Sequence, residues 1–363
     1  MRRSLALACV SVFLASLTTT AALAATGHYA LTDLGDLTKS HTQGVTFVSA
    51  INDKGEIVGQ SFNDQSRARA FIWRSGRMTD LGDTGNLNGK LPVLSATAIN
   101  DHAAVVGTTM ASGTLTPSHG FYWNLGLMVQ LGSLLGMGND TFASAINNSG
   151  AIVGAGFRAP GDLRAIRFVL GLPLEIGSSA DGRPAAQAFG VNNRGDVVGY
   201  LAPGGTVAFA HAFMLKGGKF TDLGVLPGTN LSFANAVNDQ RQVVGQSLNT
   251  KAATSRAFLW EGGALQDLGK AATSHTNSEA RSINEHGTVV GTSGKTANLS
   301  AWIWQEGVTR DLNTLVAAGD PLRSYVVLVK ANGINDKGQI VVQGYDKRRG
   351  SSFVRGYLLN PVK

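Results

Sequence analysis

A nine-residue motif, Ile-Asn-x-x-Gly-x-Val-Val-Gly with small changes, returns seven times along this chain of 363 residues. Its asparagine stands at Asn52, Asn100, Asn147, Asn192, Asn238, Asn284 and Asn335, so neighbouring copies lie 45 to 51 residues apart. A period in this range is typical of small supersecondary units that bury their apolar faces by stacking on one another. The repeat therefore specifies a fold and does not by itself indicate a reaction.

Each unit contains four short apolar runs, named a to d here, with turn residues between them. In the first unit they are Ser49-Ala50-Ile51, Ile57-Val58-Gly59, Ala70-Phe71-Ile72-Trp73 and a run that ends in Asp80-Leu81-Gly82. Short apolar runs between Asn, Asp and Gly turns predict β-strands joined as hairpins. The middle residue of run a is Ala, Gly or Ser in every unit. We expect such small side chains where seven strands crowd around one axis.

The two ends of the chain complement each other. One Asp-Leu-Gly, Asp33-Leu34-Gly35, precedes all the repeats, whereas the seventh unit ends at its third run, Gly356-Tyr357-Leu358-Leu359. The segment from Tyr29 to Asp33 can supply the missing fourth strand, which closes a circular array and removes its exposed edges. We therefore predict that residues 25–363 form one all-β domain, a seven-bladed β-propeller of four-stranded antiparallel blades. One extra residue in run b of the last unit indicates a bulge there.

Several of these features together resemble the extracellular HAF repeat family: the His211-Ala212-Phe213 triplet, the aromatic third run, Asp-Leu-Gly and the asparagine motif. The likeness extends over nearly the whole chain after its N-terminal segment. It implies a secreted repeat protein and adds no mechanism. Only His211 stands in a complete His-Ala-Phe triplet, so the histidine is not a shared ligand. The other units carry Arg69, His119, Arg164, Arg256, Ser300 and Arg355 or Gly356 near that place.

The N-terminal segment has the pattern of a cleaved secretory signal. Arg2 and Arg3 precede an apolar stretch that is too short to span a bilayer, and Ala22-Leu23-Ala24 provides a cleavage site. We expect residues 1–24 to be removed by Sec export, which leaves a soluble, monomeric periplasmic or extracellular protein without a transmembrane segment. The only cysteine, Cys9, lies in this segment, so the mature chain has no thiol. Loss of the two arginines lowers the formal net charge from +7 to +5.

Residue types that carry out chemistry are present, but not at catalytic spacing. The repeat asparagines recur in every unit and the aspartates of the Asp-Leu-Gly motifs in five of the seven, which favours a structural role in turns. The histidines match no zinc motif and are expected to be solvated loop residues, and no Gly-x-Ser-x-Gly elbow is present. The tryptophans recur with the blades, so we expect them in the core between blades. The sequence predicts no metal and no cofactor.

Loop charge provides the remaining signal. In a propeller the b–c and d–a connections emerge on one face, where ligands commonly dock. The b–c connections are rich in arginine, which is consistent with docking of an anionic polysaccharide or cell-envelope polymer and equally with the solvated surface of a basic protein. The candidate ligand-binding residues are Arg67, Arg69, Arg158, Arg164, Arg256 and Arg348.

Three functions are compatible with these observations. The first is a secreted, non-catalytic binding or scaffold propeller. The second is a polysaccharide lyase or glycosidase at the axial mouth, which would bring together residues such as His41, Asp140 and Glu279 from different d–a loops. The third and weakest is nucleic-acid binding, which is not expected because the cationic loops lack interleaved aromatic residues.

Overall fold

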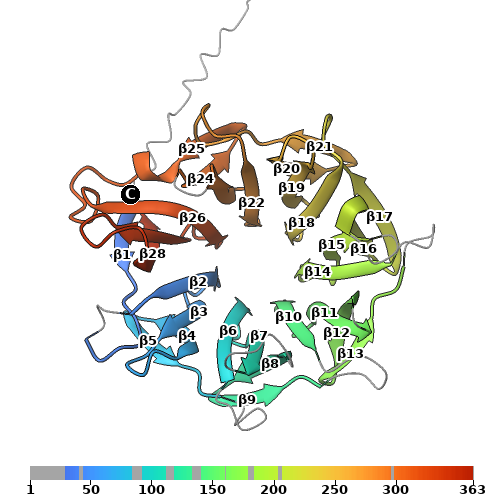
Figure 1. The fold of residues 1–363 in the computed structure, drawn as a ribbon, viewed down its shortest axis with the longest axis horizontal. Coiled ribbons are helices and arrows are strands. Elements are labelled where there is room, and N and C mark those ends of the chain that lie inside the picture. The colour runs from blue at the N-terminus through green and yellow to red at the C-terminus, as the bar shows by residue number, and fades with distance from the viewer. Residues whose placement is uncertain are drawn as a thin grey trace, which may run out of the picture.

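The computed structural model describes residues 29–40, 44–83, 92–111, 118–132, 140–159, 161–178, 184–202, 207–295 and 298–362. They form a ring of seven sheets around a central axis, each of four antiparallel strands (Figure 1). The predicted seven-bladed β-propeller is therefore confirmed. The expected signal segment, residues 1–24, lies outside the described residues. In the described ranges no helix is long and apolar enough to cross a membrane.

Strands a, b, c and d of each blade follow one another from the axis to the rim. Blade 1 consists of β2 (Thr46–Ile51), β3 (Ile57–Phe62), β4 (Ala68–Arg74) and β5 (Arg77–Asp80); blade 2 of β6 (Pro92–Ile99), β7 (Val105–Ala111), β8 (Ser118–Asn124) and β9 (Leu127–Gln130). Blade 3 consists of β10 (Thr141–Ile146), β11 (Ile152–Ala159), β12 (Asp162–Val169) and β13 (Leu172–Glu175); blade 4 of β14 (Ala185–Val191), β15 (Val197–Leu201), β16 (His211–Lys216) and β17 (Lys219–Gly224). Blade 5 consists of β18 (Leu231–Val237), β19 (Val243–Asn249), β20 (Thr254–Glu261) and β21 (Ala264–Asp267); blade 6 of β22 (Ser278–Ile283), β23 (Val289–Ser293), β24 (Ser300–Gln305) and β25 (Val308–Asp311). Blade 7 consists of β26 (Val326–Ile334), β27 (Ile340–Asp346), β28 (Val354–Pro361) and β1 (Tyr29–Asp33).

Blade 7 closes the ring with strands from both ends of the chain. β1 pairs antiparallel with β28, from Tyr29 opposite Pro361 to Asp33 opposite Tyr357, as the sequence predicts (Figure 1). A buried ion-pair network joins the same two segments. The guanidinium of Arg355 donates to Asp36 at 2.6 Å and to Asp33 at 2.9 Å. Because the Arg355 side chain is only 5% exposed and that of Asp36 is fully buried, this network lies in low dielectric, where charge pairing is strong.

The aromatic third strands provide the cores between blades. The first aromatic residue of strand c is completely or almost completely buried in six blades, and Ile166 takes its place in blade 3. These six residues are Phe71, Phe121, Phe213, Phe258, Trp302 and Tyr357. Trp73 and Trp123 are also buried, while Trp260 and Trp304 pack at the edge of the cores. The expected role of the tryptophans in the core is thus confirmed.

The repeat asparagines form a closed circle of hydrogen bonds. In each a–b turn the Asn Oδ1 accepts from backbone amides of its own turn, as Asn52 does from Lys54 and Glu56. The Nδ2 donates to the carbonyl of the next repeat asparagine, from Asn52 to Asn100 at 2.9 Å and onward until Asn335 donates back to Asn52. The remaining five links have the same form. Each buried amide therefore ties one blade to the next, which confirms its structural role.

The Asp-Leu-Gly aspartates stabilise the end of strand d. Their carboxylates accept from the backbone amide two residues later, as Asp80 does from Gly82 at 2.9 Å. Most of them also bind the residue eleven positions earlier, on strand c, at the position that His211 occupies in blade 4. The pairs are Arg69–Asp80, His211–Asp222, Arg256–Asp267 and Ser300–Asp311. In blade 7 the pair is Arg355–Asp33, so the same contact serves to close the ring.

A candidate binding cavity at the axial mouth

Each inner strand carries a β-bulge at one repeated position, three residues before the repeat asparagine. The pairing with strand b skips this residue in all seven blades. Bulges of this kind turn a side chain away from the regular pleat and recur next to binding sites. The seven bulged residues are Ser49, Thr97, Ser144, Phe189, Asn235, Arg281 and Asn332.

The Gly of Val-Val-Gly allows this geometry. A Cβ atom on Gly154 would lie 1.8 Å from the carbonyl oxygen of Phe142 on the bulged strand, and five other blades show a similar approach. Blade 7 has Val342 in this register instead. There β26 carries a second pairing shift, between Leu328 and Lys330, and the close approach moves to Gly344. The irregularity expected from the extra residue is confirmed, but the bulge lies in β26 rather than in run b.

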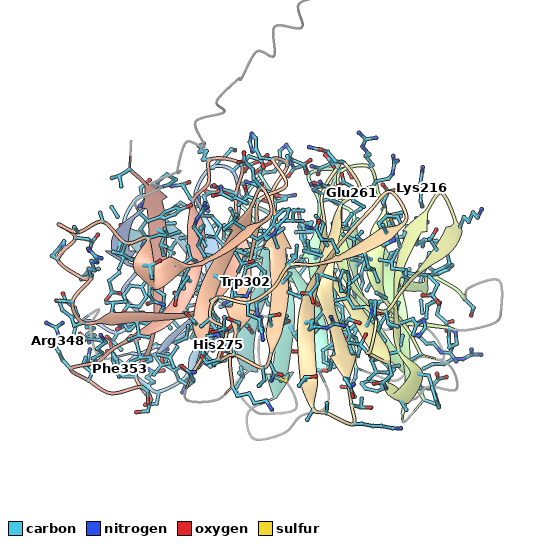
Figure 2. The ribbon with its side chains drawn as sticks, turned by 90° about the horizontal axis from the view of Figure 1, so that it is seen from above. Lys216, Glu261, His275, Trp302, Arg348 and Phe353 are labelled. Carbon is cyan, nitrogen blue, oxygen red and sulfur yellow. The ribbon has the colours of Figure 1, made fainter. Side chains whose placement is uncertain are left out.

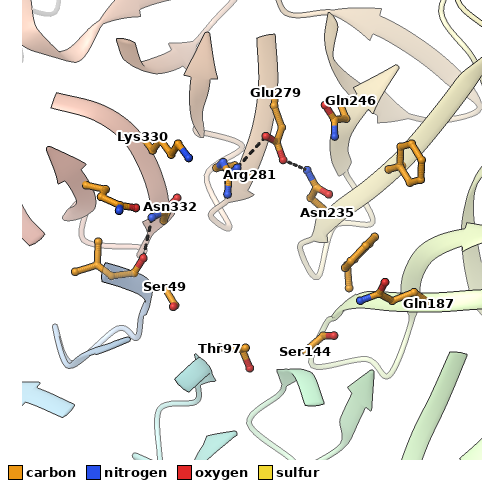
Figure 3. A pocket seen from close by; sticks show the side chains of 14 residues that line it. Ser49, Thr97, Ser144, Gln187, Asn235, Gln246, Glu279, Arg281, Lys330 and Asn332 are labelled. Atoms are coloured by element: carbon orange, nitrogen blue, oxygen red, sulfur yellow. Dashed lines mark hydrogen bonds and ion pairs between the residues drawn. The ribbon is translucent and has the colours of Figure 1, made fainter. Parts of the chain in front are cut away.

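The seven bulged side chains surround a cavity of about 660 Å³ at the mouth of the axial channel (Figure 3). The other lining residues are Val48, Gln187, Phe233, Gln246, Glu279, Lys330 and Gln343. The lining residues of strand a lie at the bulge or one or two residues before it, whereas the residues at the a–b turns line a second hollow at the other end of the channel. The cavity therefore opens toward the face that carries the d–a and b–c connections. Its volume lies in the range of small-ligand sites.

The repeat symmetry is broken in this lining. Blades 1 to 3 contribute only small hydroxyl side chains from their bulges, namely Ser49, Thr97 and Ser144. Blades 4 to 7 contribute Phe189, Asn235, Arg281 and Asn332 at the same positions. The turn asparagine beside each bulge is identical in every blade, so the ring itself does not require this variation. The cavity therefore has one side of small hydroxyls and one side of large polar and aromatic groups.

The large polar groups lie on blades 5, 6 and 7. Arg281 donates to Glu279 at 2.9 Å, and Asn235 donates to the same carboxylate at 3.2 Å (Figure 3). Lys330 makes no ion pair with any described residue. Among the described residues, the Nε of Arg281 and the Oδ1 of Asn332 are buried and lack a hydrogen-bond partner. Two cations against one carboxylate leave the cavity with a positive excess and with donors and acceptors that can serve a ligand.

An aromatic wall forms another part of the cavity. Phe189 and Phe233 line it from neighbouring inner strands. Tyr200 lies between them, with ring centroids 5.8 Å from Phe189 and 5.0 Å from Phe233. Burial raises the pKa of Tyr200, which fits its place in the core behind the wall. These rings are held by one another, so a fixed apolar face lies on blades 4 and 5.

The other end of the channel is acidic. A second circle of hydrogen bonds runs there, in which the residue after each repeat asparagine accepts from the equivalent backbone amide of the preceding blade. Examples are Asp53 accepting from Asp336 and Asn148 accepting from Asp101. Burial and the neighbouring carboxylates of Asp336 and Asp101 raise the pKa of Asp53; burial and nearby aspartates likewise raise that of Glu285. The channel is thus anionic at its a–b end and cationic at the cavity.

The structure disperses the arginines that the sequence indicates as ligand-binding. None of the six is among the residues that line the cavity. Arg69 is buried between Asp80 and Asp83, and Arg256 pairs with Asp267. Both therefore take part in the contact between strands c and d.

The other four arginines lie in blades 1, 3 and 7. Arg164 pairs with Asp162, and Arg158 lies 3.9 Å from Glu175. Arg348 binds Asp346 and stacks on Tyr325, while Arg67 is exposed and its side chain makes no hydrogen bond or ion pair within the described ranges. Docking of a polymer on these loops remains a prediction.

The residues considered for an enzyme do not converge in the described structure. His41 lies outside the described residues. Asp140 accepts from the backbone amide and the hydroxyl of Ser118, away from the cavity lining. Glu279 does reach the axial mouth, but from strand β22 rather than from a loop, which corrects the expectation. It is the only carboxylate among the lining residues.

The histidines are less exposed than expected. His275 is 5% exposed, with its Nδ1 2.8 Å from the hydroxyl of Ser293. His119 is half-buried, and burial lowers its pKa against the opposing effect of Asp140. The expectation of solvated loop histidines is therefore wrong for these two, because His119 lies in strand β8 and His275 packs against Ser293 of β23. No group of three or more His, Cys, Asp or Glu side chains in the described ranges is arranged to hold a metal ion.

The fold and the cavity define the class of protein, a seven-bladed β-propeller with a ligand-sized axial cavity. No known family model matches the chain, and no curated protein sequence matches it. Solved structures do match. The chain is similar to an oligogalacturonate lyase in complex with manganese, with 12% identity, a TM-score of 0.56, and 93% of this chain and 95% of that chain covered.

Two peptidase structures match as well. One is the β-propeller domain of the Trilobed protease from Pyrococcus furiosus, with 11% identity, a TM-score of 0.50, and 87% and 93% of the two chains covered. The other belongs to a study of two prolyl endopeptidases, with 12% identity, a TM-score of 0.57, and 93% of this chain but 51% of that chain covered. The chain thus spans about half the length of the endopeptidase. At these identities the likeness shows the propeller fold alone.

Proposed function

We propose that this protein is a secreted, non-catalytic binding propeller that takes a segment of an acidic glycan in its axial cavity. The observation that carries this proposal is the broken symmetry at the bulged positions. Seven equivalent positions point into one cavity, and four of them carry a large aromatic or polar side chain that the ring does not need. Such grafted variation on a repeated scaffold is where function is usually located.

The chemistry of the lining matches an acidic sugar. Arg281 and Lys330 provide positive charge for a carboxylate, and charge-assisted hydrogen bonds are the strongest that such a ligand can make. The carboxamides and small hydroxyls suit sugar hydroxyl groups, which both donate and accept. The fixed rings of Phe189 and Phe233 provide an apolar surface for the C–H face of a pyranose. The arginines of the b–c loops lie on the same face, where Arg67 and Arg348 can contact a longer anionic chain.

The lining favours binding over hydrolysis. Glycosidases of the common mechanisms use two carboxyl groups on either side of the scissile bond, and only Glu279 is present among the lining residues. Its carboxylate is also held by Arg281 and Asn235. The alternative of a polysaccharide lyase shares the ligand class of this proposal, and a fold neighbour is described as an oligogalacturonate lyase. Trigalacturonate is therefore the first probe, and product analysis distinguishes binding from cleavage.

Titration calorimetry with trigalacturonate at two salt concentrations tests the proposal. Lys330→Gln removes a charge without breaking an ion pair, and Lys219→Gln, an exposed lysine of β17 that also makes no ion pair with a described residue, provides a matched control outside the cavity. We expect Lys330→Gln to weaken binding about tenfold, equivalent to roughly 1.4 kcal/mol. Binding should also weaken with salt and be absent for the uncharged galactose trimer. Equal affinity of wild type and Lys330→Gln, or no binding at all, would overturn the site; unsaturated or hydrolysed products would overturn its non-catalytic character.

A further inference from the structure

Two hairpin tips expose leucine almost completely. Leu125, between β8 and β9, is 93% exposed, and Leu170, between β12 and β13, is 99% exposed. Both also have positive φ, at 50° and 51°. A bulky residue in this left-handed region is strained, and an exposed leucine gains nothing from folding. Neither leucine is therefore explained by the stability of the ring.

The equivalent hairpin tips in other blades show what the turn itself prefers. They carry Ser75, Gly217, Gly262 and Glu306, all at positive φ. Glycine or a polar residue is thus sufficient for the same turn in blades 1, 4, 5 and 6. The leucines are a local departure of blades 2 and 3 from the repeat.

The apolar surface continues along the outer strands of these two blades. Leu127 and Val129 on β9 are 67% and 48% exposed, and Leu172 and Leu174 on β13 are 58% and 42% exposed. The two strands are joined where the amide of Gly132 donates to the carbonyl of Gly171 at 3.1 Å. We name these six exposed side chains, on two neighbouring outer strands and their hairpin tips, the leucine-rich patch. Exposed apolar patches on the order of several hundred Å² mark interaction sites.

Cations stand in the c–d hairpins of the two neighbouring blades. Arg77 stands in the hairpin of blade 1, and Lys216 and Lys219 stand in that of blade 4. All three are exposed, and none makes an ion pair with a described residue. Lys216 and Glu261 project at the edge of the disc opposite Arg348 and Phe353 (Figure 2). The c–d hairpin tips therefore lie on the face opposite the axial cavity.

We propose that the leucine-rich patch docks on the surface of an anionic lipid bilayer. Projecting leucines flanked by cations match such a surface, because apolar side chains enter the acyl boundary while lysine and arginine remain at the headgroups. A second copy of the chain fits less well, since a stable dimer buries about 800 Å² on each partner and the tips project rather than form a flat face.

The docked orientation has a consequence for the cavity. The carboxylates of Asp53, Glu285 and Asp336 lie at the axis on the same face as the hairpin tips, and an anionic bilayer would repel them if the disc lay flat. The patch is on the rim of blades 2 and 3, so the disc stands tilted with these acids away from the lipid. The axial cavity on the opposite face then remains open.

Vesicle co-sedimentation tests this inference on the chain from residue 25 onward, which contains every described strand. The vesicles are phosphatidylcholine alone or mixed with phosphatidylglycerol. The variant Leu125→Ser with Leu170→Gly introduces residues that other blades use at these turns, so its thermal stability should equal or exceed that of the wild type. Val308→Ser, an exposed apolar residue in the hairpin of blade 6, is the matched control.

We expect the wild type and Val308→Ser to bind the anionic vesicles and the double leucine variant to bind at least tenfold more weakly. Arg77→Gln with Lys219→Gln should remove the salt-sensitive part of binding. The inference is overturned if the wild type does not sediment with anionic vesicles or if the leucine variant binds equally well. A micromolar dimer that the leucine variant abolishes would assign the patch to a second copy instead. Trigalacturonate binding should be unchanged in the leucine variant, so this test is independent of the proposed function.

Discussion

Loss of Arg355 should destabilise the ring more than loss of any arginine at an equivalent position. Its guanidinium donates to Asp36 and Asp33 in a site where the arginine side chain is 5% exposed and Asp36 is fully buried. Removing one partner of a buried pair costs about 3–5 kcal/mol because the other charge is left without compensation. Asp36 would keep the backbone donors Thr38 and Gly44, so we expect Arg355→Ala to lose about 3 kcal/mol.

Blade 5 provides the control for this perturbation. Arg256 occupies the same position as Arg355, but its pair with Asp267 is exposed at 36% and 38%. Exposed pairs contribute about 1 kcal/mol or less, so Arg256→Ala should change the free energy of unfolding correspondingly little. The assay is chemical denaturation followed by tryptophan fluorescence. Proteolytic cleavage on the C-terminal side of residue 28 serves as a second probe, because it reports detachment of β1. Adding Asp36→Asn to Arg355→Ala should recover part of the loss.

The pH dependence of the free energy of unfolding provides an independent test of the same network. Burial alone would raise the pKa of Asp36, but hydrogen bonds from Thr38, Arg355 and Gly44 outweigh it and hold the pKa below the ordinary value of 3.8. A carboxyl group whose pKa is lower in the folded than in the unfolded state stabilises the fold at pH values above its unfolded pKa. This stabilisation is lost as the pH falls through its folded pKa. The difference in the free energy of unfolding between wild type and Arg355→Ala should therefore become smaller at acidic pH. Equal destabilisation by Arg355→Ala and Arg256→Ala, or a gap that widens in acid, would refute the role given to the network.

Two further variants test the bulge and the acidic end of the channel. Gly154→Ala should cost about 2 kcal/mol or more in chemical denaturation, because its Cβ would lie 1.8 Å from the carbonyl of Phe142; Gly156→Ala on the same strand, with its nearest neighbours at 3.4 Å, should cost less than about 1 kcal/mol, and equal costs would contradict the bulge. Asp53→Asn keeps an amide oxygen as the acceptor, like the Asn148 oxygen that accepts from Asp101, and removes a carboxylate whose pKa is raised. It should therefore stabilise the fold by roughly 1 kcal/mol or less at neutral pH and not at all below pH 3.8. Thermal melts of wild type and Asp53→Asn, from neutral pH to below pH 3.8, measure the difference in stability between them. Destabilisation of the variant at neutral pH would show that the carboxylates do not repel one another.

The architecture could be predicted because the repeat states the same information seven times. The asparagine turns, the small residue in run a and the complementary ends of the chain each have a direct physical reading. The ion pairs between strands c and d could also have been predicted from the sequence. The constant spacing of eleven residues between Arg69 and Asp80, and between Arg256 and Asp267, is visible in the sequence, but the arginines were assigned to a ligand instead.

The cavity could not be predicted because it depends on a register shift. Alternation along run a does not reveal that Arg281 is bulged and turned into the channel. The glycine of Val-Val-Gly is a signal for that shift, since a glycine inside a strand often marks a bulge or a close backbone approach. A comparison of the seven units at the residue three positions before the asparagine would then have shown the change from Ser49 to Arg281. Lys330 lies within β26, two residues before the bulged Asn332.

A crystal structure of the protein soaked with trigalacturonate tests the central claim most directly, that the bulged residues form the ligand site. We predict electron density for at least one sugar in the axial cavity, with its carboxylate within hydrogen-bond distance of Arg281 or Lys330 and a pyranose face against Phe189 or Phe233. Density only on the arginines of the b–c loops, or a saturated crystal with the cavity free of sugar, would contradict it.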